Sequence, residues 1–539
     1  MAVTDSRRHT RALSTTLFFF VFVLVGWLGV TSVDFGVHWD ENKLIGSLQD
    51  TARGGEWIPR WYHYPSMCYD IGMLVVVGSA LRDRTLNRSE GLGGYLPRIA
   101  GDGRFRHDLR RVFFLLSSLA GLGTYLLARR LTGCSWSALF AGSLLLSSWE
   151  YMYHSRWVAP DAILATIVIW TLLAQQILRE KRSSSSRRGW VVIASVLAGM
   201  CIGTKYPGGI VVLPMIVAIE GWPRHVPCEQ ASRRHQGHFG DLVLAALVTA
   251  CSFLLITPGL VVQPLQFLQD VLSEVSHYRR GHGGYTVAPG FDHLSKILGY
   301  LVFCGFSKFS ALAICYFMLV LLGTGALLHR RNDDALWLLV LPVAYLAYMS
   351  SQRVMIVRNY LLVLPVLAVL AGVGVQVLVN CSRRLLRQVL PSMAVVGIVV
   401  GLWVFACASR RIEHRICADP GGALIAWLRN QPDEKFCLSP QARRLIQDRL
   451  LVAPVNVSND PAHASHFVYL STEVVERSLL PANTFGRYRT VWSAFDDVNW
   501  DYYPTWVGSL RILDVSTDDA SVKGLILRAM RSDQEQIQP

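Results

Sequence analysis

The chain has 539 residues, of which 52% are hydrophobic and only 17% are charged. A soluble domain carries about 25% charged residues, so this composition excludes an ordinary soluble protein. Long apolar runs alternate with short arginine-rich links, as in proteins whose helices need about 20 apolar residues to cross a bilayer. The net charge of +14 lies mostly in these links. Cytoplasmic loops of membrane proteins collect lysine and arginine, so this charge indicates topology and no nucleic acid partner.

The apolar runs predict about eleven transmembrane helices. The first follows Arg7, Arg8 and Arg11 and is too long for the core of a signal peptide, so we expect an uncleaved span with a cytoplasmic N-terminus. The predicted spans are residues 13–33, 112–131, 135–149, 158–178, 189–204, 205–222, 241–262, 297–328, 335–350, 360–379 and 389–408. The run 297–328 is long and is expected to break near Ser307 and Lys308.

The direction of every later helix depends on whether a further apolar stretch, 67–81, crosses the membrane. It is short and Asp70 interrupts it. If it does not cross the membrane, five later loops are cytoplasmic, and together they hold 15 lysines and arginines. The loops on the other side then hold seven lysines and arginines. The loop rule favours this topology, so 67–81 is predicted to be an interfacial or re-entrant helix. It would lie within a large first extracytoplasmic loop, residues 34–111.

The character of the chain changes after Ala408. Residues 409–539 are polar with short apolar patches, which is typical of a small α/β domain. Eleven spans from a cytoplasmic start place this domain outside the cell. The predicted fold is therefore mainly α. It has a polytopic helical membrane module over residues 1–408 and a C-terminal extracytoplasmic α/β domain over residues 409–539.

Unusual polar residues gather at the outer ends of the predicted spans. Taken singly, each has an ordinary explanation: Arg279 could anchor a helix at the interface, and Asp161 could start a helix. Lys205 is harder to explain, since it stands between two apolar runs, where an unpaired charge costs about 2.5–3.5 kcal/mol. Carboxylates facing several cations on one side of the membrane indicate a site for an anionic ligand that carries phosphate.

Six segments at these junctions form an ordered set of motifs. They are His38-Trp39-Asp40-Glu41-Asn42, Tyr64-Pro65-Ser66-Met67, Ser155-Arg156 with Asp161, Thr204-Lys205-Tyr206, His277 to Gly283, and Arg358-Asn359-Tyr360 with Pro365. Each motif alone is weak, whereas their order, spacing and common side of the membrane are specific.

The set resembles the GT-C membrane glycosyltransferases, in the branch of protein O-mannosyltransferases and aminoarabinose transferases (glycosyltransferase family 39 and relatives). The resemblance covers about residues 12–380. It implies a donor in which the sugar is linked to a polyprenyl phosphate. One departure stands out, because the motif that begins with lysine in the family begins with Tyr64 here.

The resemblance assigns roles to the polar residues. Asp40 is expected to be the catalytic base of an inverting reaction, with Glu41 orienting the acceptor or a neighbouring residue, and Asp161 as the reserve base. The donor phosphate is expected to bind Arg156, Lys205, Tyr64, Arg279 and Arg280. The remaining substrate contacts are expected from His38, His63, Tyr206, His277, His282, Arg358 and Tyr360.

Several family members work without metal, so no cofactor is expected to be required. If a divalent ion did bind, His38, His63 and His282 would be its ligands. The expected partners are a sugar linked to polyprenyl phosphate, a hydroxyl acceptor that is lipid, glycan or protein, and membrane lipids. A transporter or flippase for an anionic or lipid-linked substrate is the alternative, although the sequence contains no inverted repeat.

Overall fold

The computed structural model consists of two compact units, Met1–Gly281 with Val287–Arg410, and His282–Thr286 with Arg411–Pro539. The description below covers residues 2–33, 39–54, 57–83, 95, 99, 103–181, 184–220, 228–282, 285–307, 310–330, 332–381, 420–439, 442–443, 456–458, 463–470, 490–494 and 510–514.

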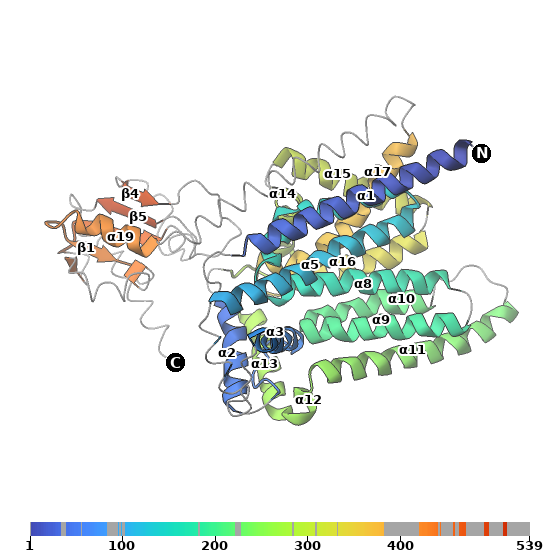
Figure 1. Ribbon diagram of the computed structural model, residues 1–539, viewed down its shortest axis with the longest axis horizontal. Helices are drawn as coiled ribbons and strands as arrows, with labels where there is room; N and C mark the ends of the chain where they lie inside the picture. The colour runs from blue at the N-terminus through green and yellow to red at the C-terminus, as the bar shows by residue number, and fades with distance from the viewer. Residues whose placement is uncertain are drawn as a thin grey trace. The chain divides into compact units, whose positions relative to one another are not determined.

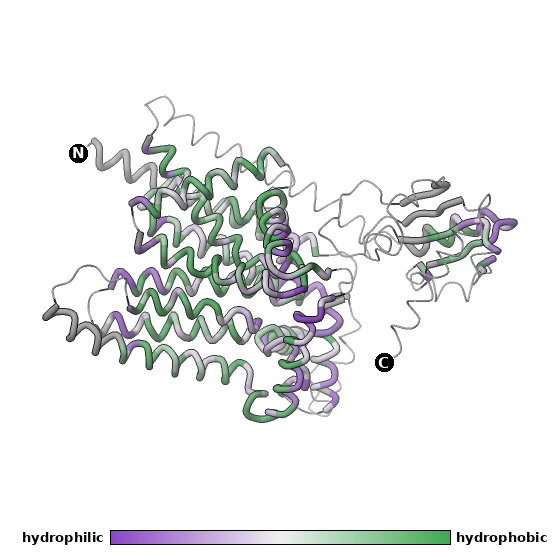
Figure 2. The backbone as a smooth tube through the Cα atoms, turned by 180° about the vertical axis from the view of Figure 1, so that it is seen from behind, coloured by the Kyte–Doolittle hydropathy of each residue, from purple (hydrophilic) through white to green (hydrophobic). Residues whose placement is uncertain are grey.

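The first unit is a bundle of long helices that lie side by side (Figure 1). Figure 2 shows that these helices are hydrophobic along their middle, with hydrophilic residues near their ends. The helices of the bundle are α1 (Ala2–Thr31), α5 (Gly103–Thr132), α6 (Ser135–Ser147), α8 (Pro160–Glu180), α9 (Ser184–Thr204), α10 (Val212–Glu220), α11 (Cys228–Ile256), α15 (Ser310–Arg330), α16 (Asn332–Ser350) and α17 (Leu364–Cys381).

The lengths and hydropathy of these helices are those of a multi-pass membrane protein. Within the part of the chain that the structure describes, seven helices are long and apolar enough to cross a bilayer, and Ser135–Ser147 and Tyr206–Glu220 are shorter apolar helices. The predicted break in the run 297–328 is confirmed, because α14 (Phe291–Phe303) ends before α15 begins at Ser310. The last predicted span, 389–408, lies outside the described residues.

Shorter helices lie at one end of the bundle. The stretch 67–81 is helical, as α3 (Met67–Asp83), and both α2 (Trp39–Arg53) and α3 run across the ends of the long helices (Figure 1), as expected of interfacial helices. The remaining short elements are α7 (Trp149–Ser155), η1 (Tyr206–Val211), α12 (Gly259–Val262), α13 (Pro264–Arg280) and η2 (Val357–Val363).

Helix α8 runs from one end of the bundle to the other, so its length gives the distance between the two ends. Its 21 residues span about 30 Å, from Asp161 in the first turn to Arg179 in the last. At the far end Arg179 pairs with Asp334 at 2.8 Å, and Arg130 pairs with Glu180. The ionic groups around Asp161 therefore lie a whole membrane thickness away from the arginine-rich links.

The second unit contains helix α19 (Pro420–Arg429) and a mixed five-stranded sheet. The strand order is β2-β1-β3-β5-β4, with β1 parallel to β2 and β3, and the other pairs antiparallel. The strands are β1 (Phe436–Leu438), β2 (Val457–Ser458), β3 (His466–Leu470), β4 (Thr490–Ala494) and β5 (Leu510–Asp514). The predicted fold class, a mainly helical membrane protein with a small α/β part, is confirmed.

Glycines allow α15 and α17 to pack with their backbones in close contact. A Cβ atom at Gly323 would overlap the carbonyl oxygen of Leu370, and a Cβ at Gly374 would overlap that of Leu319. Small residues serve this purpose in membrane helices, where dispersion contacts replace the hydrophobic effect as the force that joins helices. In contrast, a Cβ at Gly325 would meet no atom within 4 Å.

We therefore expect Gly323→Ala to push α15 and α17 apart and to destabilise the bundle by about 1–3 kcal/mol, the usual penalty for overpacking. Gly325→Ala, in the same helix, should leave the melting temperature in detergent unchanged or slightly higher, because alanine is the better helix former. Equal melting temperatures for the two variants would show that the close contact does not limit stability.

Candidate functional site

An ionic cluster forms where three chain junctions meet at one end of the bundle. Asp161 lies in the first turn of α8, Lys205 just before η1, and Arg358 within η2. Lys205 Nζ is 2.7 Å from Asp161 Oδ1, and Arg358 Nε is 3.3 Å from Asp161 Oδ2. All three side chains are buried. The charge of Lys205 that the sequence left unexplained is thus neutralised by a carboxylate, as a buried ammonium requires.

Asn359 connects this cluster to the surrounding aromatic residues. Its Oδ1 accepts hydrogen bonds from Lys205 Nζ at 2.6 Å and from the Tyr278 hydroxyl at 3.5 Å, and the Tyr345 hydroxyl donates to its backbone carbonyl at 2.6 Å. Its Nδ2 is buried and has no hydrogen-bond partner among the described residues. This N–H group is therefore a donor that a ligand oxygen can use.

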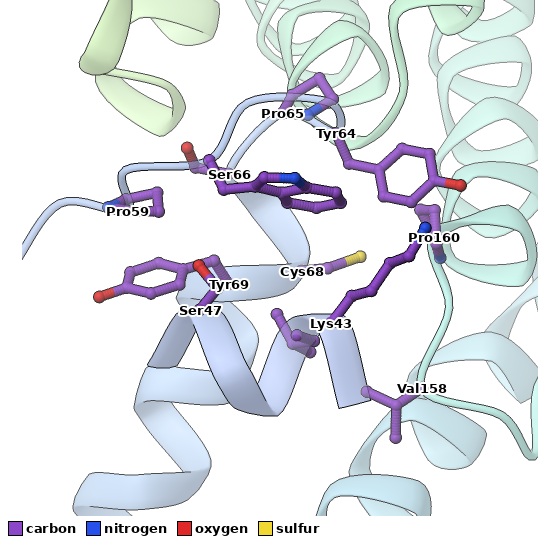
Figure 3. Close-up of a pocket in the computed structure, with 12 residues that line it drawn as sticks. Lys43, Ser47, Pro59, Tyr64, Pro65, Ser66, Cys68, Tyr69, Val158 and Pro160 are labelled. Atoms are coloured by element: carbon purple, nitrogen blue, oxygen red, sulfur yellow. The ribbon is translucent and has the colours of Figure 1, made fainter. Parts of the chain in front are cut away.

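Tyr64 contacts Lys205 of the ionic cluster and is also one of the residues that line a pocket (Figure 3). The Lys205 ammonium lies 5.8 Å from the centroid of the Tyr64 ring, within the range of a cation–π contact. The residues that line this pocket are Lys43, Leu44, Ser47, Pro59, Trp61, Tyr64, Pro65, Ser66, Cys68, Tyr69, Val158 and Pro160. Residues from α2, from the 57–66 segment and from the start of α8 thus line one space.

Glu41 forms a second buried ion pair. Its carboxylate accepts two hydrogen bonds from Arg110 of α5, Nε to Oε1 at 2.8 Å and NH2 to Oε2 at 2.6 Å, and a third from the Val158 backbone N–H at 3.3 Å. Arg110 also donates to the Val33 carbonyl at 2.8 Å. This pair joins α2 to α5 and to the segment before α8. Of the two neighbours predicted with it, the side chain of Asp40 and the whole of His38 lie outside the described residues.

The other predicted cations differ in their surroundings. Arg156 is buried at the end of α7, where its NH1 donates to Ser32 Oγ at 3.0 Å, beyond the end of α1. Arg279 and Arg280 are exposed in the last turn of α13, which also contains His277. Arg156 is thus enclosed by the protein, whereas Arg279 and Arg280 are accessible from outside it.

The 57–66 segment is held on α13 by a set of polar contacts. Asp270 accepts a hydrogen bond from the Tyr62 backbone N–H at 2.7 Å. His63 Nδ1 lies 3.5 Å from Glu274, and the Tyr206 hydroxyl donates to the Tyr62 carbonyl at 2.6 Å. His63 and Tyr206 therefore fix the segment that carries Tyr64. His282 belongs to the second compact unit.

Two further contacts involve residues near the cluster. Tyr360 is buried and its hydroxyl pairs with His293 Nε2 at 2.8 Å. Glu150, a fully buried carboxylate of α7, accepts a hydrogen bond from the Tyr300 hydroxyl at 2.8 Å and lies 3.6 Å from His154. Glu150, Arg110 and His293 were not among the residues predicted for the site. The only signal for Glu150 was an acidic residue at the end of an otherwise apolar run.

Burial controls protonation around the pocket. It raises the pKa of the Cys68 thiol, and the carboxylates of Asp161 and Asp70 add to that effect, so the thiol stays protonated. Burial also raises the pKa of Asp70 to about 7 and the pKa of the Tyr278 phenol. Burial lowers the pKa of His293, although the hydrogen bond that its Nδ1–H group donates to the Gln352 carbonyl acts in the opposite direction, so its imidazole is neutral at pH 7.

Metal binding is not indicated by the described part of the chain, in which no three side chains of His, Cys, Asp or Glu come together as ligands of an ion. Metal independence therefore stays a prediction.

The chain is similar to one protein family over part of its sequence and to several solved structures in its fold. The family model "Dolichyl-phosphate-mannose-protein mannosyltransferase" matches residues 98–228, which include Arg156, Asp161 and Lys205. No curated protein sequence matches the chain significantly. Among solved structures, apo ArnT from Cupriavidus metallidurans is similar at 17% identity with a TM-score of 0.50, over 96% of this chain and 99% of that one. The oligosaccharyltransferase of Archaeoglobus fulgidus has a TM-score of 0.48 at 14% identity, over 83% of this chain and 65% of that one.

The predicted resemblance is thus confirmed: the chain is a multi-pass membrane protein with the fold of the GT-C glycosyltransferases, and its segment 98–228 matches the dolichyl-phosphate-mannose-protein mannosyltransferase family.

Proposed function

We propose that the chain is an inverting glycosyltransferase, which moves a sugar from a polyprenyl-phosphate donor to a hydroxyl acceptor at the extracytoplasmic face. The observation that carries this proposal is the buried cluster of Asp161, Lys205, Arg358 and Asn359 next to the Tyr64 pocket. A cluster of this kind supplies what a departing phosphate needs, which is preorganised positive charge in a dry site.

The charges of the cluster support a phosphate ligand. Lys205 and Arg358 carry two positive charges and Asp161 one negative, so these three groups together have a net charge of +1. The Asn359 Nδ2 group adds a hydrogen-bond donor. ArnT from Cupriavidus metallidurans has also been solved with undecaprenyl phosphate bound, which makes a polyprenyl phosphate the natural ligand to test here.

In the proposed reaction the acceptor hydroxyl oxygen bonds to the anomeric carbon of the sugar while the bond from that carbon to the phosphate oxygen breaks. The bonding electrons leave with the lipid phosphate, and the hydroxyl proton passes to a carboxylate. Asp40 is the proposed base. Asp161 is the weaker choice, because two cations already hold its carboxylate. Glu41 acts through Arg110 as a positioning residue that fixes the start of α2.

The acceptor class stays open among lipid, glycan and protein hydroxyls. The proposed location outside the cell depends on the loop charges, since the arginine-rich links lie at the end of the bundle opposite to the cluster.

Replacing the proposed base gives the first test. Asp40→Asn keeps the shape of the side chain but removes the proton acceptor, so transfer should fall by at least about 10²–10⁴-fold while donor binding stays nearly intact. Glu41→Gln should instead lower the melting temperature, because it leaves Arg110 buried without its counter-charge. Transfer rate, donor binding and melting temperature measured for both variants separate these roles. An active Asp40→Asn beside an inactive Asp161→Asn would move the base to Asp161.

The leaving-group role of the cluster gives the second test. Lys205→Met removes the buried ammonium and should lower the transfer rate by about 10²-fold or more, as the loss of a preorganised electrostatic contact does. Lys296→Met, at an exposed lysine of α14, is the matched control and should transfer normally. If folded Lys205→Met protein transferred sugar at the wild-type rate, the phosphate would have to bind elsewhere.

Membrane orientation gives the third test. Asp50 of α2 and His329 of α15 are both exposed. In a variant without the chain's own 11 cysteines, Asp50→Cys should react with a membrane-impermeant maleimide added to whole cells. His329→Cys should react only after the cells are lysed. The reverse pattern would put the Tyr64 pocket in the cytoplasm.

A further inference from the structure

Helix α13 has an exposed apolar face that the proposed reaction does not use. Four aliphatic residues recur along the helix at intervals of three or four, so they lie on one face. They are Leu265, Leu268, Leu272 and Val275, and all four are exposed. Exposed aliphatic side chains in such a row indicate a surface that contacts another apolar phase.

A second face of α13 holds the first loop. Asp270 accepts the hydrogen bond from the Tyr62 backbone N–H at 2.7 Å, and Glu274 lies 3.5 Å from His63 Nδ1. Helix α12 contacts the same segment, because a Cβ atom at Gly259 would overlap the Tyr62 ring. The two helices therefore support the 57–66 segment, which carries Tyr64.

The third face of α13 is polar and exposed. It contains Gln266, Gln269, Ser273 and Arg280, which are again three, four and seven residues apart. A helix that separates apolar and polar exposed faces in this way lies in the plane of a membrane interface, with one face in the acyl chains and the other in water.

The apolar face of α13 continues a surface that already belongs to the membrane. The span Phe239–Ile256 of α11 is mostly exposed, and Leu255 near its end is 83% exposed. The next helix, α12, exposes Val261 and Val262. Figure 1 shows α12 and α13 at the same end of the bundle as α2 and α3. Exposed apolar residues thus follow one another from a membrane span into α13.

The charges of α13 favour an anionic surface. Arg279 follows Val275 by four residues, so it extends the apolar face at its C-terminal end, and Arg280 lies beside it on the polar face. Both arginines are exposed. The two acidic residues of the helix, Asp270 and Glu274, are directed instead to the 57–66 segment.

From this arrangement we infer that α12 and α13 form a docking surface for a bilayer of anionic phospholipid. The aliphatic face of α13 contacts the acyl chains, and Arg279 contacts the headgroups. The surface is separate from the donor site, so Arg279 is assigned to bulk phospholipid in place of the donor phosphate expected from the sequence. Because the opposite face of α13 holds Tyr62 and His63, the bilayer supports the segment that carries Tyr64.

Fluorescence quenching in nanodiscs without polyprenyl lipid tests the docking surface. In the variant without native cysteines, Leu268→Cys and Ser273→Cys are each labelled with an environment-sensitive fluorophore. The label at residue 268 should be quenched by brominated phospholipid and shielded from iodide in the water. The label at residue 273, on the polar face, should show the reverse. Equal access of iodide to both labels would overturn the inference.

Brominated phosphatidylglycerol in a phosphatidylcholine nanodisc tests the role of Arg279. The affinity of this lipid for the surface, measured by quenching of the label at residue 268, should fall about fivefold in Arg279→Gln, the usual effect of losing one cation near an anionic membrane. Arg188→Gln, at an exposed arginine of α9, is the matched control and should bind the lipid as wild type. Unchanged affinity in Arg279→Gln would contradict the headgroup contact. Neither measurement depends on sugar transfer, so both can succeed or fail independently of the proposed function.

Discussion

The pairing of Lys205 with Asp161 is the constraint on which the site depends. An ammonium buried at the end of a membrane bundle requires a carboxylate, and removing one partner of such a pair costs about 3–5 kcal/mol. The pair connects the start of α8 to the junction between α9 and η1, and Asn359 adds η2 to the same point. Three chain junctions are therefore fixed together before any substrate binds.

The Glu41–Arg110 pair performs the same task for the first loop. Both side chains of this pair are buried, and the pair holds α2 against α5. Lys43, which lines the pocket, is also a residue of α2. On the opposite side the 57–66 segment is anchored to α13 through Asp270, which places Tyr64. The pocket thus lies between two polar anchors, so its width depends on ion pairs and hydrogen bonds as well as on apolar packing.

Much of the fold could be predicted, because a lipid environment forces long apolar runs with charged links. The break before Ser310 and the helix Met67–Asp83 follow from the same pattern. The partners in the site could not be predicted, because Lys205 and Asn359 are 154 residues apart and Tyr62 and Asp270 are 208 apart. Arg110 gave no signal either, since one arginine within a basic stretch looks like any other.

The buried cations of the ionic cluster suit the step of the proposed reaction in which the phosphate leaves. A donor phosphodiester carries one negative charge, whereas the released lipid phosphate carries nearly two at pH 7, because its second pKa is about 6. Fixed charge around Lys205 therefore stabilises the transition state more than the donor, which is the condition for catalysis. The same charge would hold the product tightly.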